Sequence, residues 1–360
     1  MSSTTTDVST RPLVGRRRAT VLLLAAATVA AFLLSIALGS VSIPLSDIAR
    51  IFVGAEPARS GHRTIVLLFR LPKALTALCA GAGLAVSGLI MQTLFRNPLA
   101  GPFVLGINSG ASLGVALTVL AVGGVGASGL LSQLGLLGDL GTIVAASLGS
   151  AIVLLLVLIV SRRVAGVMTL LILGLLFGYA VNAVTSILIH YSVADRIQAY
   201  VAWTFGSFGG VTWQQLALLG PILAVSLVAA TFLAKSLNAL LLGERYAESM
   251  GLNIRRSRIL IVTVTAIQAG AVTAFCGPIG FIGIAIPHLC RALMRTADHR
   301  VLLPTTMLVG ACAALVADIV AQLPGAQSVL PLNAVTALVG APVVAWVILG
   351  RRGFDRTLAG

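Results

Sequence analysis

The sequence predicts an all-α polytopic membrane protein with about ten transmembrane helices. Hydrophobic residues make up 58% of its 360 residues and charged residues only 9%, and the mean hydropathy is +1.06. A soluble domain carries roughly 25% charged residues. Apolar runs of about 18 residues or more, long enough to cross a bilayer, recur along the whole chain. The composition therefore excludes a water-soluble domain.

The expected spans form one membrane domain, residues 19–350, between an N-terminal tail at 1–18 and a C-terminal tail at 351–360. The ten spans are residues 19–39, 65–91, 103–123, 141–161, 167–190, 213–234, 257–276, 280–295, 301–322 and 333–350. The first apolar run exceeds the ~7–15 residues of a signal-peptide core, which predicts an uncleaved first span.

Helix-breaking and small residues define the early spans. Residues 40–64 are a polar connection, and RNPLAGP at 96–102 ends the second span, because Asn-Pro and Gly-Pro disfavour helix continuation. In the third span, Gly106, Gly110 and Gly114 have the small-xxx-small spacing that lets another helix approach closely.

The later connections differ in character. The glycine-rich residues 123–140 predict a short outer loop. Residues 191–212 are amphipathic, and Trp203 and Trp213 beside them favour the headgroup level. GPIGFIG at 277–283 predicts a helix break at or near the membrane surface.

The basic residues predict the orientation. With the N-terminus inside, inner segments hold 18 of the 24 Lys and Arg residues and outer segments hold 6. Cytoplasmic loops are enriched in Lys and Arg, so both termini are expected in the cytoplasm. The net charge of +14 is thus a topology signal, and no nucleic-acid interface is expected.

The long polar insert, residues 235–258, lies between the sixth and seventh spans. Apolar residues at 242, 246, 247 and 250 share one helical face, and Gly251 is placed to end the helix. Two interpretations remain open from the pattern alone. One is a short cytoplasmic helix that lies in a groove of another protein; the other is a merely solvated loop.

Catalytic and metal-binding motifs do not occur in the sequence. The chain has only two lysines, Lys73 and Lys235, and neither belongs to a phosphate-binding loop, so ATP hydrolysis by that mechanism is excluded. The cysteines lack metal or disulfide spacing and are expected to be buried hydrophobes: Cys79, Cys276, Cys290 and Cys312. We therefore expect no cofactor, no metal site and no enzymatic activity.

Few ionisable residues fall within the spans. For Asp318, the position favours a role in a structural pair or at a helix end over a role as a proton relay. For His288, a hydrogen-bonded core or interfacial histidine is favoured over a ligand. His190 and Tyr191 favour an interfacial pair over contact with an iron-bearing cargo. A proton-coupled secondary transporter remains the rival from another class, since an ionisable residue in a membrane is a functional candidate.

Five motifs in series resemble the permease subunits of ABC importers for iron chelates and cobalamin. They are RLPKALTALCAGAGLAVSGLIMQTLFRNPLAGPFVLGINSGASLG from Arg70 to Gly114, LLLGERYAESMGLN, GPIGFIGIAIPHLCR, ADHRVLLP, and ADIVAQ with the later LPLNAVTALVGAPVVAWVI. The resemblance implies a type II importer fold of ten helices in the bacterial inner membrane. It also implies a homodimer, two ATP-binding cassette subunits below, and a periplasmic or lipid-anchored binding protein above.

The resemblance assigns roles to three groups of residues. The coupling segment, residues 240–256, would contact the ATPase through Leu242, Gly243, Glu244, Arg245, Tyr246, Ala247, Met250 and Gly251. The inner gate would comprise Asn97, Pro98, Leu99, Gly166, Val167 and Met168. Docking of the binding protein would use Arg70 and the position of Gln322, where relatives can have a second basic residue; Lys73, Arg59 or Arg63 could replace it.

The function implied is ATP-driven alternating access. Movement of the coupling segments would open and close the gate around a pathway lined by the fifth and tenth helices. An iron chelate, either a ferric siderophore or haem, is the expected cargo, and cobalamin is the next candidate. A bare metal ion would require a ring of carboxylate, His or thiolate ligands, which the spans lack.

Overall fold

The computed structural model describes residues 11–39, 41–121, 139–163, 167–322 and 329–357, and every regular element in them is a helix. Seven helices are long and apolar enough to cross a membrane, and three shorter apolar helices accompany them. Together these ten follow the order of the ten expected spans. The fold class predicted from composition and hydropathy is therefore confirmed.

The elements fall into two groups. The helices that correspond to the spans are α1 (Arg11–Ala37), α4 (Leu71–Phe95), α5 (Ile107–Ala116), α7 (Asp139–Arg163), α8 (Val167–His190), α10 (Trp213–Phe232), α13 (Ile254–Cys276), α14 (Ile282–Met294), α15 (His299–Ala321) and α16 (Leu332–Thr357). The connecting elements are α2 (Leu45–Phe52), α3 (Ser60–Thr64), the π-helical η1 (Ile65–Arg70), the 3-10 helix η2 (Pro102–Leu105), the π-helical η3 (Leu117–Ala121), α9 (Ala194–Thr204), α11 (Ala234–Leu241) and α12 (Glu244–Ser249).

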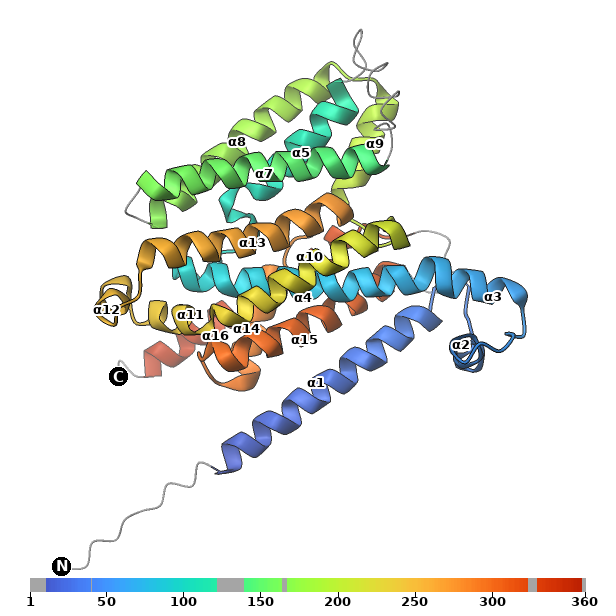
Figure 1. The fold of residues 1–360 in the computed structure, drawn as a ribbon, viewed down its shortest axis with the longest axis horizontal. Coiled ribbons are helices and arrows are strands. Elements are labelled where there is room, and N and C mark those ends of the chain that lie inside the picture. The colour runs from blue at the N-terminus through green and yellow to red at the C-terminus, as the bar shows by residue number, and fades with distance from the viewer. Residues whose placement is uncertain (1–10, 40, 122–138, 164–166, 323–328, 358–360) are drawn as a thin grey trace, which may run out of the picture.

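Helix α4 is the centre of the bundle, and α10, α13, α14 and α15 pack around it (Figure 1). Its glycines allow this because they bring backbones into contact. A Cβ atom on Gly88 would lie 1.7 Å from the carbonyl oxygen of Gly283 in α14, and one on Gly81 would lie 2.3 Å from that of Gly310 in α15. Small residues at helix contacts favour close packing in a membrane, where the hydrophobic effect between helices is weak.

The layer formed by α5, α7 and α8 lies on the other side of α13 (Figure 1). The close approach predicted for the third span is confirmed here. A Cβ on Gly110 would lie 2.5 Å from the carbonyl oxygen of Gly149, and one on Gly114 would lie 2.1 Å from that of Ala145. Gly106 has a positive φ of 75°, which starts α5 directly after η2.

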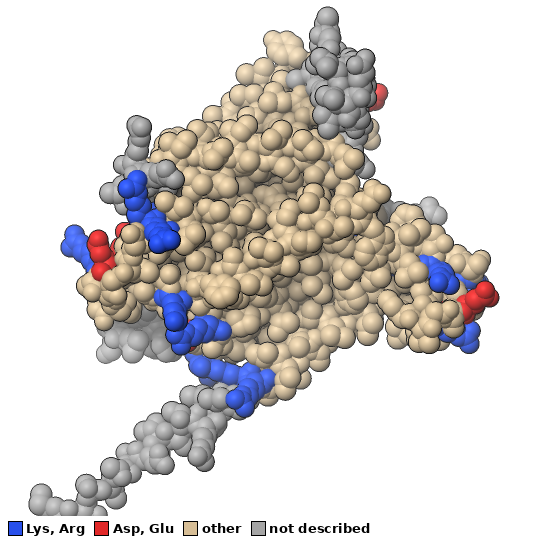
Figure 2. Space-filling view, in the orientation of Figure 1, with Lys and Arg blue, Asp and Glu red and all other residues tan. Residues whose placement is uncertain are grey.

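Most charged residues in this view lie at the two ends of the bundle, and the surface between them is uncharged (Figure 2). One end carries α12, the start of α1 and the end of α16, and the other carries the α2–α3 lobe (Figure 1). Lys and Arg predominate at the first end in this view, in agreement with the expected asymmetry (Figure 2). The assignment of this end to the cytoplasm stays a prediction.

Several boundaries differ from the expected ones. The connection at 40–64 contains α2 and α3, and the helix from Ser60 runs on through η1 into α4 for 36 residues. Helix α1 begins at Arg11, within the expected N-terminal tail. Helix α16 continues to Thr357, within the expected C-terminal tail. The loop expected at 123–140 lies almost wholly outside the described residues.

The break before α14 lies inside the protein, since residues 277–279 are all buried. Helix α14 has only 13 residues, which is about 20 Å of helix, against a hydrocarbon thickness of ~30 Å. The backbone of the break is held by neighbours: Gly280 N donates to Asn333 Oδ1 at 2.8 Å, and Asn333 N donates to the Phe205 carbonyl at 3.0 Å. Such non-helical backbone is tolerated where protein groups satisfy it.

Candidate functional site

The coupling segment forms a helix, α12, and not a solvated loop. Gly243 starts it with a φ of 117°, and Gly251 follows it with a φ of 85°, so the predicted helix stop is confirmed. The predicted face divides in two. Ala247 is fully buried, whereas Leu242, Tyr246 and Met250 are more than half exposed. The coupling segment therefore exposes three apolar side chains, while Ala247 packs into the protein behind them.

An ion pair fixes α12 against α13. Glu244 Oε1 accepts a hydrogen bond from Arg258 Nη2 at 3.0 Å, and Arg258 is buried. The backbone adds a second connection, because Leu252 N donates to the carbonyl of Ala247 at 3.0 Å. Arg245 remains exposed beside the apolar residues. These contacts hold the segment as a firm projection from the bundle.

A partly buried polar network joins α11 to α15 and α4 just before the coupling segment. Asn238 Nδ2 donates to Asp298 Oδ1 at 2.6 Å, and Asn238 Oδ1 accepts from both the backbone N and the Nδ1 of His299 at 2.9 and 2.8 Å. His299 Nε2 lies 2.8 Å from Thr93 Oγ1. Sequence analysis missed this network, although Asp298 before an apolar run is the usual signal of a helix N-cap.

Asp298 caps α15 by accepting a hydrogen bond from Arg300 N at 2.9 Å. The hydrogen bond from Arg300 N is the largest cause that holds the pKa of the Asp298 carboxyl below its usual range. The hydrogen bond from Asn238 is the second cause. A carboxylate at a helix N-terminus is also favoured by the helix dipole. Asp298 therefore has defined partners on both α11 and α15.

The predicted gate turn, Asn97 to Leu99, follows α4 directly. Asn97 Oδ1 accepts a hydrogen bond from Leu99 N at 2.9 Å, and the Asn97 carbonyl accepts from Ala100 N at 3.0 Å. His288 in α14 donates from Nε2 to the Pro98 carbonyl at 2.7 Å. His288 is buried, so the sequence-based interpretation of a satisfied core histidine agrees with its contact.

A hollow of about 330 Å³ separates this turn from α8. Its lining comprises Asn97, Leu99, Ala100, Phe103, Val104, Ser109, Leu171, Gly174, Leu175, Gly178, Tyr179 and Asn182. Two of the predicted gate residues, Asn97 and Leu99, thus face α8, the helix expected to line the pathway, across this hollow. The predicted gate residues at 166–168 do not line this hollow in the described structure. Met168 is exposed at the start of α8. The side chain of Val167 is not described, and Gly166 lies outside the described residues.

The predicted docking residues lie at the opposite end and are engaged within the protein. Arg70 is buried, and its guanidinium donates to the carbonyls of Ile36 and Ala37 at 2.7 and 2.8 Å and to that of Val41. Gln322 Nε2 donates to Asp318 Oδ2 at 2.8 Å. In this structure Arg70 caps the end of α1 and is not presented on the surface. Its docking role stays a prediction.

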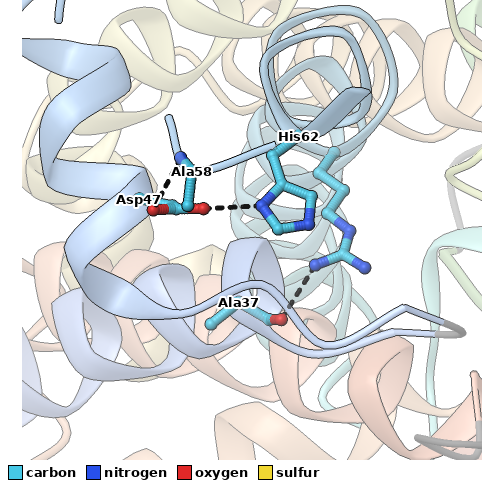
Figure 3. A network of polar contacts seen from close by, with 5 residues as sticks. Ala37, Asp47, Ala58 and His62 are labelled. Carbon is cyan, nitrogen blue, oxygen red and sulfur yellow. Dashed lines mark hydrogen bonds and ion pairs between the residues drawn. The ribbon is translucent and has the colours of Figure 1, made fainter. Parts of the chain in front are cut away.

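The α2–α3 lobe beside Arg70 contains a buried hydrogen-bonded pair, His62 and Asp47 (Figure 3). His62 Nδ1 donates to Asp47 Oδ2 at 2.7 Å, and Ala58 N donates to Asp47 Oδ1 at 3.3 Å. The bond from His62 is the main cause that holds the pKa of the Asp47 carboxyl below its usual range. This pair joins α2 to α3. Arg59 and Arg63, which sequence analysis named as possible docking residues, are exposed on the same lobe.

Within the described residues, ten apolar helices with a short helix between the sixth and seventh form a polytopic membrane permease of the kind that the sequence resemblance predicts. Residues 27–350 match the FecCD transport family, and the chain belongs to this family. It is a permease subunit of an ABC importer, which works with ATPase subunits and a substrate-binding protein.

Curated relatives and a solved structure agree with this membership. The vitamin B12 import system permease protein BtuC of Klebsiella pneumoniae is 40% identical over 284 residues, which cover 79% of this chain and 82% of that protein. BtuC of Salmonella typhi is 40% identical over 280 residues, 78% and 82% of the two chains. An inward-facing structure of a metal-chelate type ABC transporter has a TM-score of 0.80 and 28% identity, and the match covers 92% of this chain and 99% of that one.

Proposed function

We propose that two copies of this chain form the transmembrane core of a bacterial importer that passes an iron chelate, a ferric siderophore or haem, by alternating access. The chain itself is non-catalytic, and ATP is hydrolysed by two cassette subunits that contact α12. A periplasmic or lipid-anchored binding protein delivers the cargo to the α2–α3 end. The importer lies in the inner membrane with both termini of the chain in the cytoplasm.

The observation that carries this proposal is the construction of α12. Three exposed apolar side chains, those of Leu242, Tyr246 and Met250, project from a segment that Ala247 and the Glu244–Arg258 pair hold in place. An exposed apolar helix face suits a groove on a partner protein. Because the segment is held firmly, a push from that partner would move the helices behind it.

Exposed apolar surface supports the homodimer. The resemblance expects α8 and α16 along the two-fold axis, and both helices leave large side chains uncovered: Ile172, Leu175, Leu176, Leu338 and Val339. The lining of the hollow next to α8 includes Tyr179, which is 64% exposed. A second copy would complete the wall of the pathway.

The lining of the hollow supports a whole chelate as cargo. It combines apolar side chains with the neutral polar groups of Asn97, Ser109, Tyr179 and Asn182. Amides and hydroxyls can hydrogen-bond the periphery of an organic chelate without competing for its metal. Weak contacts of this kind suit a passage, because the binding protein has already selected the cargo.

Cobalamin is the second candidate, and the names of the curated relatives favour it. A direct measurement decides between the two: the cognate binding protein is titrated with haem, cobalamin and several ferric siderophores, and fluorescence quenching or calorimetry reports the binding. Tight binding of cobalamin alone would replace the iron chelate by the second candidate and leave the importer mechanism intact.

The mechanism is tested at α12. Alanine replacement of Glu244, Tyr246 and Met250 together is expected to abolish import and assembly with the ATPase. Tyr246→Ala with Met250→Ala leaves the Glu244–Arg258 pair intact and serves as the fold-preserving variant. Wild-type import and co-purification of the ATPase by both variants would refute the proposal.

A matched triple at the other end of the molecule controls for general damage. Glu56, Tyr191 and Val53 are exposed and offer, as the first triple does, an acidic, an aromatic and an aliphatic side chain. Their replacement by alanine is expected to leave ATPase co-purification unchanged. The proton-coupled rival predicts a different result: uptake that persists with a hydrolysis-dead ATPase and stops with a protonophore.

A further inference from the structure

We propose that Arg96 is a positioning residue that ties the coupling segment to the gate turn, so that movement of α12 is carried into Leu99. The inference rests on the proposed function of both segments and names the side chain that connects them.

Arg96 ends α4 in a left-handed conformation, with a φ of 48°. This conformation turns the chain out of the helix and leaves the side chain at the coupling segment. Its Nη2 donates to the carbonyl of Leu240, in the last turn of α11, at 3.0 Å. A Cβ on Gly243 would lie 3.0 Å from the same nitrogen, so the guanidinium lies against the backbone of Gly243.

The guanidinium of Arg96 contacts backbone atoms of the coupling segment. Leu240 and Gly243 bracket the turn that leads into α12, so any displacement of α12 moves the atoms that Arg96 holds. A hydrogen bond with a charged donor is among the stronger ones in proteins. The tie therefore follows the position of the coupling segment and does not depend on its side chains.

The residues after Arg96 form a stiff turn. Asn97 binds the backbone of Leu99 and Ala100, and His288 binds the Pro98 carbonyl at 2.7 Å. Leu99, only three residues from Arg96, is 48% exposed and lines the hollow against α8. A displacement of Arg96 is thus transmitted to Leu99, because hydrogen bonds hold the turn between them.

The plain alternative is that Arg96 only caps α11. Helix C-termini leave carbonyl groups unsatisfied, and an arginine there is favourable without any role in movement. A capping role predicts the same loss of stability in every nucleotide state. A tie predicts that the response of the gate to nucleotide is lost while folding and ATP hydrolysis continue.

The variant Arg96→Gly separates these alternatives. Glycine adopts a positive φ without strain, so the backbone at the end of α4 is relieved while the guanidinium is removed. Arg295→Gly is the matched control, because Arg295 ends α14 with a φ of 47° and is likewise exposed. Arg96→Lys keeps a cationic donor and is expected to rescue the response in part.

The readout is the labelling rate of Leu99→Cys by a maleimide, in vesicles that contain the permease with its ATPase subunits. Rates are compared with ADP and with ATP plus vanadate, which needs no cargo. Cys79 and Cys312 are half-buried, so the same complex without Leu99→Cys supplies the background rate. The ratio of the two rates measures coupling between ATPase and gate.

We expect the parent Leu99→Cys complex to change its labelling rate with nucleotide by roughly fivefold or more, a typical coupling between two sites. Arg96→Gly should reduce this ratio to near one and keep ATP hydrolysis, whereas Arg295→Gly should preserve both. A full ratio in Arg96→Gly overturns the tie alone. A parent ratio of one overturns the proposed gate, and the tie with it.

Discussion

The ammonium group of Lys73 in α4 lies 3.0 Å from the carboxylate of Asp318 in α15. The side chain of Asp318 is only 5% exposed, and Gln322 donates a second bond to it at 2.8 Å. A carboxylate that is paired and hydrogen-bonded in this way joins two central helices. The arrangement agrees with the structural pairing that the sequence favoured over a proton relay.

Replacement of Asp318 by Asn is expected to destabilise the protein by about 2–3 kcal/mol, because it leaves the largely buried charge of Lys73 without a partner. The double variant Lys73→Met with Asp318→Leu removes both charges and should recover much of the loss. Thermal unfolding in detergent measures both effects. Uptake by the double variant should remain dependent on ATP; its loss in a stable, assembled protein would argue for a transport role of the pair.

Arg70 offers a test of capping against docking. Arg70→Met deprives the carbonyls of Ile36, Ala37 and Val41 of their donor, and we expect a loss of about 1–3 kcal/mol in stability. Arg63→Met, an exposed arginine on the same lobe, should change stability by no more than about 0.5 kcal/mol. Equal unfolding temperatures for the two variants would contradict the capping role.

A different substitution of Arg70 tests the predicted docking site. Arg70→Glu should weaken binding-protein affinity at low salt if Arg70 meets an acidic partner residue, since charged contacts at the rim of an interface set salt dependence. With Gln322 at the second position, we expect the salt dependence of docking to be weak. Unchanged affinity of Arg70→Glu at low salt, in a variant that still folds, would remove Arg70 from the docking site.

The contact between Gly88 and Gly283 predicts a sharp intolerance to side chains. Gly88→Ala places a methyl group 1.7 Å from a carbonyl oxygen, so α4 and α14 must separate. The expected destabilisation is at least about 1–3 kcal/mol, the usual range for overpacking. Gly220→Ala in α10 meets no atom within 4 Å and should be neutral or slightly stabilising. Unfolding temperatures of the two variants in detergent provide the comparison.

The Asp47–His62 pair predicts an acid-sensitive lobe. The pKa of Asp47 is lowered in the folded state, chiefly by the hydrogen bond from His62. The pair thus contributes stability above the unfolded value of about 3.9 and loses it as the pH falls through the lower, folded value. Asp47→Asn should flatten this part of the stability curve, as measured by thermal unfolding between about pH 6 and about pH 2, a range that extends below the unfolded value. An unchanged curve would contradict the coupling.

The order of the ten apolar helices in the described residues follows from the sequence because it depends on local properties. Apolar length placed the spans, and the spacing of Gly110 and Gly114 predicted a close helix contact that the structure contains. Glycines at 243 and 251 bound α12, as turn chemistry requires. These features are encoded in runs of residues that are neighbours in the chain.

The connections between distant residues do not follow from the sequence in the same way. Asn238 and His299 are 61 positions apart, and His288 and Pro98 are 190 apart, so no spacing rule brings them together. The burial of Arg70 depends on where α1 ends relative to η1. The length of α14 likewise depends on how its neighbours satisfy the broken backbone at 277–281.

The glycine contact between α5 and α7 limits how the passage can widen. With Gly110 and Gly114 pressed onto the backbone of Gly149 and Ala145, neither helix can rotate or slide without collision or loss of the contact. We therefore expect α5 and α7 to move as one unit if the proposed pathway opens. A side chain added at Gly110 or Gly114 is then expected to impair import without any contact with the cargo.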